Sequence, residues 1–118
     1  MTQKEKNEFI AEKLFGFTKR VFEDGSGYWY VPPSDWKFMY KGIINFEETW
    51  QQVVEKLYEC GAYEITLLSE LDGYCCEIKW HDTAKKKYGQ SVYVMDCETQ
   101  GMAIVNATVE YLKGREEV

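Results

Sequence analysis

The residues best suited to nucleophilic or metal chemistry are four cysteines, at positions 60, 75, 76 and 97, and the single histidine, His81. A thiol or hydroxyl nucleophile needs a base within hydrogen-bond reach, so any such site would have to use His81. Zinc ligands commonly occur in a C-x-x-C spacing, which this chain lacks. Cys75 and Cys76 are adjacent in a predicted strand, where successive side chains point to opposite faces. We therefore predict free thiols, no metal site and no catalytic residues, and keep a small hydrolase that uses His81 as an alternative.

The charged clusters favour solubility over catalysis. Adjacent carboxylates occur at 23–24, 47–48 and 116–117, in a predicted turn, on a helix face and in the tail, which are solvated positions poorly suited to general acid–base work. The glycine-rich segment 25–27 joins two predicted strands and lacks the Lys-Ser/Thr pair of a phosphate-binding loop. Lysines 85–87 form the one basic cluster of an acidic chain. From these residues we predict no cofactor and no nucleic-acid partner.

Aromatic residues make up 16% of the chain, and several gather between positions 28 and 40. Aromatic side chains with polar tips are favoured where one end is apolar and the other is wet, as at interfaces and in stacking pockets. Nearby arginine or lysine would meet anionic groups. These rings either complete the core beneath the helices or form an interface or a pocket for a flat ligand, and both interpretations stay open. The candidate binding residues are Arg20, Trp29, Tyr30, Trp36, Lys37 and Tyr40.

Length and composition predict one globular domain. The chain has 118 residues, of which 45% are hydrophobic and 29% charged, and a formal net charge of −6 at pH 7. This composition is ordinary for a globular protein and excludes collagen-like, coiled-coil and disordered chains. No apolar run approaches the roughly 20 residues that a membrane-spanning helix needs, and the polar start does not resemble a secretion signal. We expect a cytoplasmic protein with a single domain at 1–114 and a frayed tail at 115–118.

The first and last predicted helices are marked by their end signals. A threonine and a glutamate at positions 2 and 5 fit a capping box, which predicts a helix over 3–15 that Gly16 ends. A broadly apolar run predicts another helix over 99–113, and Gly114 is expected to end it.

The middle helix has the clearest periodicity in the chain. We predict Asn45 as its N-cap, with Glu48 as the capping partner, and Gly61 as its end. Its apolar residues share one stripe on a wheel of 3.6 residues per turn, so this stripe is the predicted core contact. The stripe consists of Phe46, Trp50, Val53, Val54, Leu57 and Tyr58.

Tight turns join the predicted strands, which lie at 17–22, 28–31, 63–67, 74–81 and 92–95. The pair Asp72-Gly73 is typical of a type I′ hairpin, whereas residues 34–44 are predicted as a loop. On the strand after this hairpin, Cys75, Glu77, Lys79 and His81 share one face. The element order α-β-β-α-β-β-β-α, with tight antiparallel connections, predicts an α+β fold.

Four segments resemble the family of small phage and prophage proteins called the phage ABA sandwich domain. They are residues 10–17 (IAEKLFGF), 28–33 (YWYVPP), 49–57 (TWQQVVEKL) and 98–104 (ETQGMAI). The resemblance extends from about residue 8 to 113. It implies an α/β/α sandwich with a mostly antiparallel sheet, and it implies no catalytic residue set. In the family the last helix typically opens with a Thr-Ala-Pro-like phrase, and here Thr99-Gln100-Gly101 lacks the proline.

Taken with that resemblance, the sequence predicts a non-enzymatic phage or prophage accessory protein in the cytoplasm of the bacterial host. We expect it to act stoichiometrically by binding a host protein. Sequestering a small, anionic, nucleotide-like ligand is the alternative that the aromatic residues leave open. Homo-oligomers are also expected, because an exposed edge strand must be covered or paired.

Overall fold

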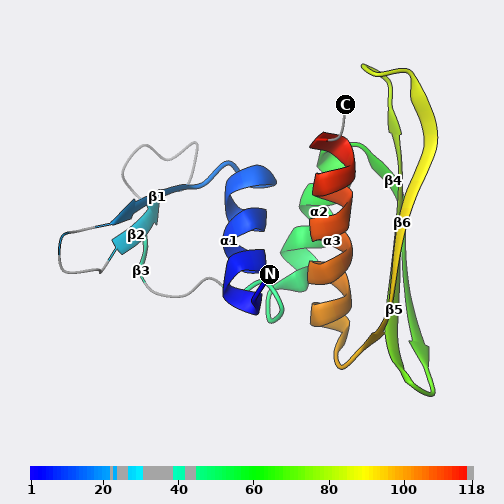
Figure 1. Ribbon diagram of the computed structural model, residues 1–118, viewed down its shortest axis with the longest axis horizontal. Coiled ribbons are helices and arrows are strands. Elements are labelled where there is room, and N and C mark those ends of the chain that lie inside the picture. Colours follow the sequence, from blue (N-terminus) through cyan, green and yellow to red (C-terminus); the bar gives the residue numbers. More distant parts are fainter. Residues whose placement is uncertain (22, 24–26, 31–38, 42–44, 117–118) are drawn as a thin grey trace. The chain divides into compact units, whose positions relative to one another are not determined.

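The computed structural model describes residues 1–21, 23, 27–30, 39–41 and 45–116. In these residues the helices and strands follow the order α1–β1–β2–β3–α2–β4–β5–β6–α3. The strands form two three-stranded sheets, and every described pairing is antiparallel. The chain divides into two compact units, Met1–Asn45 and Phe46–Val118 (Figure 1). The predicted α+β class is confirmed, and the three-layer sandwich stays a prediction.

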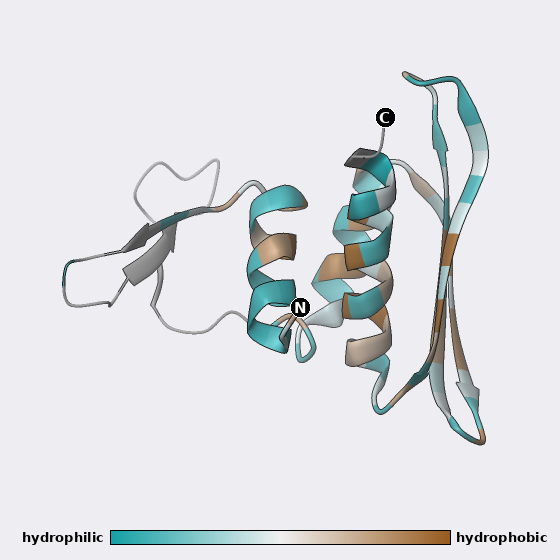
Figure 2. Ribbon diagram, viewed as in Figure 1, coloured by the Kyte–Doolittle hydropathy of each residue, from teal (hydrophilic) through white to brown (hydrophobic). Residues whose placement is uncertain are grey.

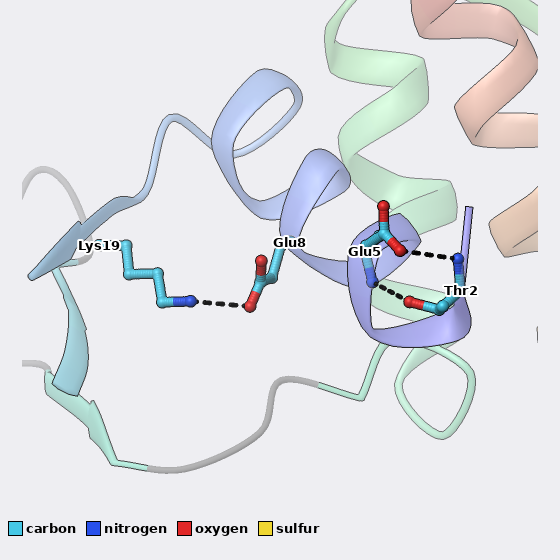
Figure 3. Close-up of polar contacts among 4 residues, drawn as sticks. All are labelled: Thr2, Glu5, Glu8 and Lys19. Atoms are coloured by element: carbon cyan, nitrogen blue, oxygen red, sulfur yellow. Dashed lines mark hydrogen bonds and ion pairs between the residues drawn. The ribbon is translucent and has the colours of Figure 1, made fainter. Parts of the chain in front are cut away.

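The first unit opens with α1 (Gln3–Lys13), and the predicted capping box is present at its start. The Thr2 hydroxyl accepts a hydrogen bond from the Glu5 amide at 3.2 Å, and the Glu5 carboxylate accepts one from the Thr2 amide at 3.3 Å (Figure 3). The bonds with the backbone and then the side chain of Thr2 hold the pKa of Glu5 below its usual 4.5. Gly16, with a φ of +71°, follows the helix as predicted.

The first sheet contains one strand more than the sequence predicted. Its strands are β1 (Thr18–Val21), β2 (Gly27–Tyr30) and β3 (Met39–Lys41), and β3 pairs with β2 inside the segment predicted as a loop. The predicted element order is therefore wrong at this point. A three-residue strand is too short to show alternation, so only its pairing reveals it. A 2.8 Å ion pair between Lys19 and Glu8 joins β1 to α1 (Figure 3).

In the second unit, α2 (Trp50–Glu59) begins later than predicted. The N-cap is Thr49 rather than Asn45, and its side chain makes no capping hydrogen bond. Residues 46–49 instead form a turn that packs against the start of the last helix, where Gly101 meets the Glu47 carbonyl. The contact between this turn and α3 outweighs the propensity of the sequence to begin the helix directly after Asn45.

The apolar stripe of α2 is confirmed in part. Phe46, Val53 and Leu57 are buried, whereas Tyr58 is largely exposed. The Tyr58 hydroxyl accepts a 3.2 Å hydrogen bond from the amide of Ile65 in β4, so this residue covers a strand rather than filling the core.

The second sheet has the order β4–β5–β6, with strands β4 (Ala62–Glu70), β5 (Gly73–Asp82) and β6 (Lys87–Cys97). The predicted hairpin between β4 and β5 is present, but its two-residue loop is Leu71 and Asp72, because Glu70 pairs with Gly73. Gly73 has a φ of +142°, and a Cβ at this position would lie 2.7 Å from the Cys97 carbonyl oxygen. Glycine is therefore required twice, by this positive φ and by the close approach of β6.

Both helices of this unit, α2 and α3 (Gln100–Glu116), lie on the same face of the second sheet (Figure 1). The side chains of β5 that face them, Cys76, Ile78 and Trp80, are buried. From α3, Tyr111 packs edge-on against Trp80 with ring centroids 4.8 Å apart. Figure 2 shows hydrophobic residues on both helices and strands of the unit. The core of this unit is thus the single layer between sheet and helices.

The last helix starts as predicted and ends later. The Thr99 hydroxyl accepts a 3.1 Å hydrogen bond from the Met102 amide, as an N-cap does. Gly114 does not end the helix, because its α-carbon faces the Trp80 ring, where a Cβ would be 3.6 Å away. The helix continues for two more residues, and Arg115 donates hydrogen bonds to the Tyr111 hydroxyl at 2.9 Å and to the Cys60 carbonyl at 3.4 Å.

Candidate interaction surface on the second sheet

The second sheet turns one face toward its helices and the other away from them, and the latter is called the outer face below. Strand alternation and the pairing register show which side chains lie on the outer face. Along the strands, these side chains are apolar or aromatic at both ends of the sheet and charged in the middle. Its residues are Tyr63, Glu64, Thr66, Leu68, Cys75, Glu77, Lys79, His81, Tyr88, Ser91, Tyr93 and Met95.

One end of the outer face is an exposed apolar cluster formed by Leu68, Tyr93 and Met95. Their exposed fractions are 46%, 46% and 57%, and together they surround Cys75, which is only 2% exposed. A hydrogen bond with the Cys75 thiol, followed by burial and nearby negative charge, raises the pKa of Tyr93 to about 12. Tyr93 is therefore tied to the buried Cys75, while about half of each of the three cluster side chains stays exposed to solvent.

The middle of the outer face carries an ion-pair row. The Lys79 ammonium lies 3.3 Å from the Glu64 carboxylate and 3.7 Å from that of Glu77. The hydrogen bond and charge of Glu64, and then the charge of Glu77, raise the pKa of Lys79 above its usual 10.5. Exposed ion pairs of this kind contribute little to folding stability. The row therefore matters mainly because it places both positive and negative charge on the outer face.

The other end of the outer face is an aromatic row, one ring from each strand. Tyr63 of β4 stacks on His81 of β5 with centroids 4.5 Å apart and planes 24° apart, and Tyr88 of β6 lies 5.8 Å from His81. The His81 Nδ1 accepts a 2.9 Å hydrogen bond from the Gly89 amide, which fixes the ring. Because Tyr63 and His81 stack on each other, the row supplies contact area rather than an open platform for a flat ligand.

The two ends of the sheet also differ in charge. The exposed residues Glu70, Asp72, Asp96 and Glu98 lie at the end with the apolar cluster. Lysines 85–87, also exposed, lie in the hairpin between β5 and β6 at the end with the aromatic row. Lys85 donates a 2.7 Å hydrogen bond to the Arg115 carbonyl. The sheet is therefore acidic and apolar at one end and basic and aromatic at the other, with the Lys85 ammonium turned toward the helix side.

The candidate binding residues predicted from sequence belong to the first unit. Arg20 lies in β1, where its backbone pairs with Tyr28, and Trp29 of β2 pairs with Tyr40 of β3. Tyr30 lies in β2, opposite Thr18 and Met39. Trp36 and Lys37 lie outside the described residues. The pairing brings parts of the set onto neighbouring strands, and their role in binding stays a prediction.

His81 and the Cys97 thiol lie at opposite ends of the second sheet. Cys97 pairs with Tyr74, which is seven residues from His81 along β5, so about 23 Å separates the two positions. Cys76 is buried toward the helices, and burial, followed by the charges of Cys97 and Glu77, raises its pKa to about 12. All four cysteines are free, and the described residues contain no group of three or more Cys, His, Asp or Glu suited to a metal.

The apolar cluster was missed at the sequence level, although a signal for it exists. Leu67 and Leu68 are consecutive, and so are the apolar residues at 92–95. A strand with only one covered face should alternate apolar and polar residues, so consecutive apolar residues indicate contacts on both faces. Such runs in β4 and β6 therefore indicate apolar side chains on both faces of the sheet.

Comparison with solved structures finds the same fold in a phage protein from Bacillus cereus, whose crystal structure aligns with a TM-score of 0.60. The alignment covers 92% of this chain and 90% of that protein, with 23% sequence identity. The resemblance to phage proteins predicted from sequence is thus confirmed as a likeness of fold. No family model and no curated protein sequence matches the chain. None of the described helices is long and apolar enough to cross a membrane.

Proposed function

We propose that this chain is a phage-encoded accessory protein that acts without catalysis, by binding a host protein through the outer face. The observation that carries the proposal is the exposed apolar cluster of Leu68, Tyr93 and Met95 on a sheet face that the helices of its unit do not cover. Large exposed apolar patches rimmed by polar residues mark interaction sites in soluble proteins.

The chemistry of the outer face suits a protein partner. Protein interfaces are enriched in tyrosine and methionine, and this face has Tyr93 and Met95 at one end beside the ion-pair row around Lys79. The likeness to a phage protein supports a role in phage biology. A stoichiometric role also agrees with the high pKa of the Cys76 thiol, which disfavours the thiolate that a cysteine nucleophile needs.

The proposal is tested by affinity capture from bacterial host cells that express the tagged full-length chain. We expect one host protein to co-purify near one-to-one stoichiometry. Leu68→Lys or Met95→Lys should reduce its recovery at least tenfold, because each places a charge in the apolar cluster. Both positions are partly exposed, so the variants should fold. Glu55→Lys on the exposed side of α2 is the matched control and should leave recovery unchanged.

Circular dichroism and thermal unfolding of each purified variant show whether it is folded. If folded Leu68→Lys and Met95→Lys recover the same host protein as fully as wild type, the outer face does not bind it. If the wild-type chain recovers no host protein above the level of an unrelated tagged control, the proposed function is wrong.

A further inference from the structure

We propose that the outer face also binds a second copy of this chain, sheet against sheet, in a symmetric dimer that shields the face when no other partner is present. The two-fold axis would lie between the sheets, perpendicular to the strands, so that opposite ends of the two copies meet. This inference deepens the proposed function, on which it rests for the use of the outer face as a contact surface.

The charge distribution supports a second copy as the occupant. Glu70, Asp72, Asp96 and Glu98 occupy one end of the sheet, and lysines 85–87 the other. The ten residues of β5 separate the ends by about 30 Å. This distance is several times the screening length of about 8 Å at physiological salt, so the two ends do not neutralise each other within one copy. Antiparallel pairing of two copies brings each acidic end over a basic end, whereas parallel pairing would place like charges together.

The rows of side chains are complementary in the same orientation. The outer-face rows along β5 are centred on Cys75, Glu77, Lys79 and His81. A two-fold axis between the Glu77 and Lys79 rows sets the Cys75 row of one copy against the His81 row of the other. Leu68 of β4 would then contact Tyr63 of the other copy, and Met95 of β6 would contact Tyr88, where contacts between a thioether and an aromatic ring are favourable. The Glu77 carboxylate of each copy would meet the Lys79 ammonium of the other.

The size of the face sets the strength of the dimer. Three strands spaced about 4.8 Å apart and about 30 Å long give a face of roughly 400 Å² per copy before side-chain relief is counted. A stable interface buries about 800 Å² per partner, and smaller ones belong to weak or transient complexes. We therefore expect a dissociation constant in the micromolar range or weaker, so that a host protein can displace the second copy.

The experiment is sedimentation velocity on the purified full-length chain from about 5 to 500 µM, in low and high salt. We expect a concentration-dependent shift toward the dimer that is reduced in high salt. The two-fold axis lays β6 of one copy over β6 of the other, so Glu98 of one copy lies near Lys87 of the other. Each such contact occurs twice in a symmetric dimer, so Glu98→Lys or Lys87→Glu alone should weaken association by about threefold to thirtyfold. The double variant should recover most of the loss, because it restores opposite charges. Met95→Lys should abolish the dimer.

Two charge reversals outside the outer face serve as matched controls, Glu55→Lys on α2 and Lys113→Glu on α3, and neither should change association. Monomeric wild type at the highest concentration would overturn the proposal, as would a dimer indifferent to Met95→Lys. A double variant no better than the single ones would overturn the antiparallel pairing. These measurements contain no host component, so their failure is distinguishable from failure to capture a host protein.

Discussion

Replacing Gly101 by alanine tests the packing that positions the second sheet. Gly101 is the second residue of α3, and a Cβ built on it would lie 2.7 Å from the carbonyl carbon of Glu47, 2.9 Å from its α-carbon and closer still to its carbonyl oxygen. These are backbone atoms, so no side-chain rotation relieves the overlap. The turn at 46–49, or the start of α3, would have to move.

The cost follows from comparison with a second glycine in the same helix. Overpacking a tight site typically costs about 1–3 kcal/mol and occasionally more, and a backbone clash belongs to the upper end of that range. We expect Gly101→Ala to lose about 3 kcal/mol, which lowers the melting temperature by about 12 °C or more. At Gly114 the added Cβ would lie 3.6 Å from the Trp80 ring, an ordinary contact, and alanine favours the helix by up to about 1 kcal/mol.

Thermal and urea unfolding of wild type, Gly101→Ala and Gly114→Ala measure both effects. We expect Gly114→Ala to be as stable as wild type or up to about 1 kcal/mol more stable. Two results would refute the reasoning: Gly101→Ala within about 0.5 kcal/mol of wild type, or both variants destabilised equally.

Three further predictions concern the core, the thiols and the first helix. Leu57→Ala should destabilise the protein by about 2–5 kcal/mol in urea unfolding, because Leu57 is fully buried; a smaller loss would contradict its place in the core. A thiol reagent at pH 8 should react readily with half-buried Cys60. Cys76 has a pKa of about 12 and should react only when the protein unfolds. Fast labelling of Cys76 in the native protein would contradict its burial. Nuclear magnetic resonance should give Glu5 a pKa below 4.5, so the capping contribution is present at neutral pH and lost as the pH falls through the folded value. Thr2→Ala keeps the backbone amide bond and removes the side chain, so the pKa should return only part of the way toward 4.5; an unchanged pKa in the variant would show that the Thr2 side chain does not contribute.

The sequence predicted elements whose signals are local. The capping box at Thr2, the hairpin before Gly73 and the alternation along β5 depend on residues close together in the chain, and each is present in the structure. The sequence failed where a distant contact decides the outcome. Asn45 lost the N-cap role because the turn at 46–49 packs on α3, and Gly114 continues the helix because Trp80 covers its α-carbon.

The candidate site was predictable only in part for the same reason. Alternation correctly placed Glu77, Lys79 and His81 on one face of a strand, but the pairing register was needed to add residues from β4 and β6. The candidate binding residues were predicted in the segment 28–40 because that segment is rich in aromatic side chains. The apolar cluster joins Leu68 to Tyr93 and Met95, which lie about 25 residues further along the chain. The consecutive apolar residues in each strand are a local signal, but only the pairing register brings the two runs together.

Photo-crosslinking tests most directly whether the outer face is a contact surface. Benzoylphenylalanine would replace Met95 on the outer face and, in a second protein, Glu55 on α2, and both proteins would be irradiated in host cells. We predict a discrete crosslinked product, with a second copy or with a host protein, for position 95 and none for position 55. Equal products at both positions, or none at position 95 while position 55 crosslinks, would contradict the assignment of the outer face.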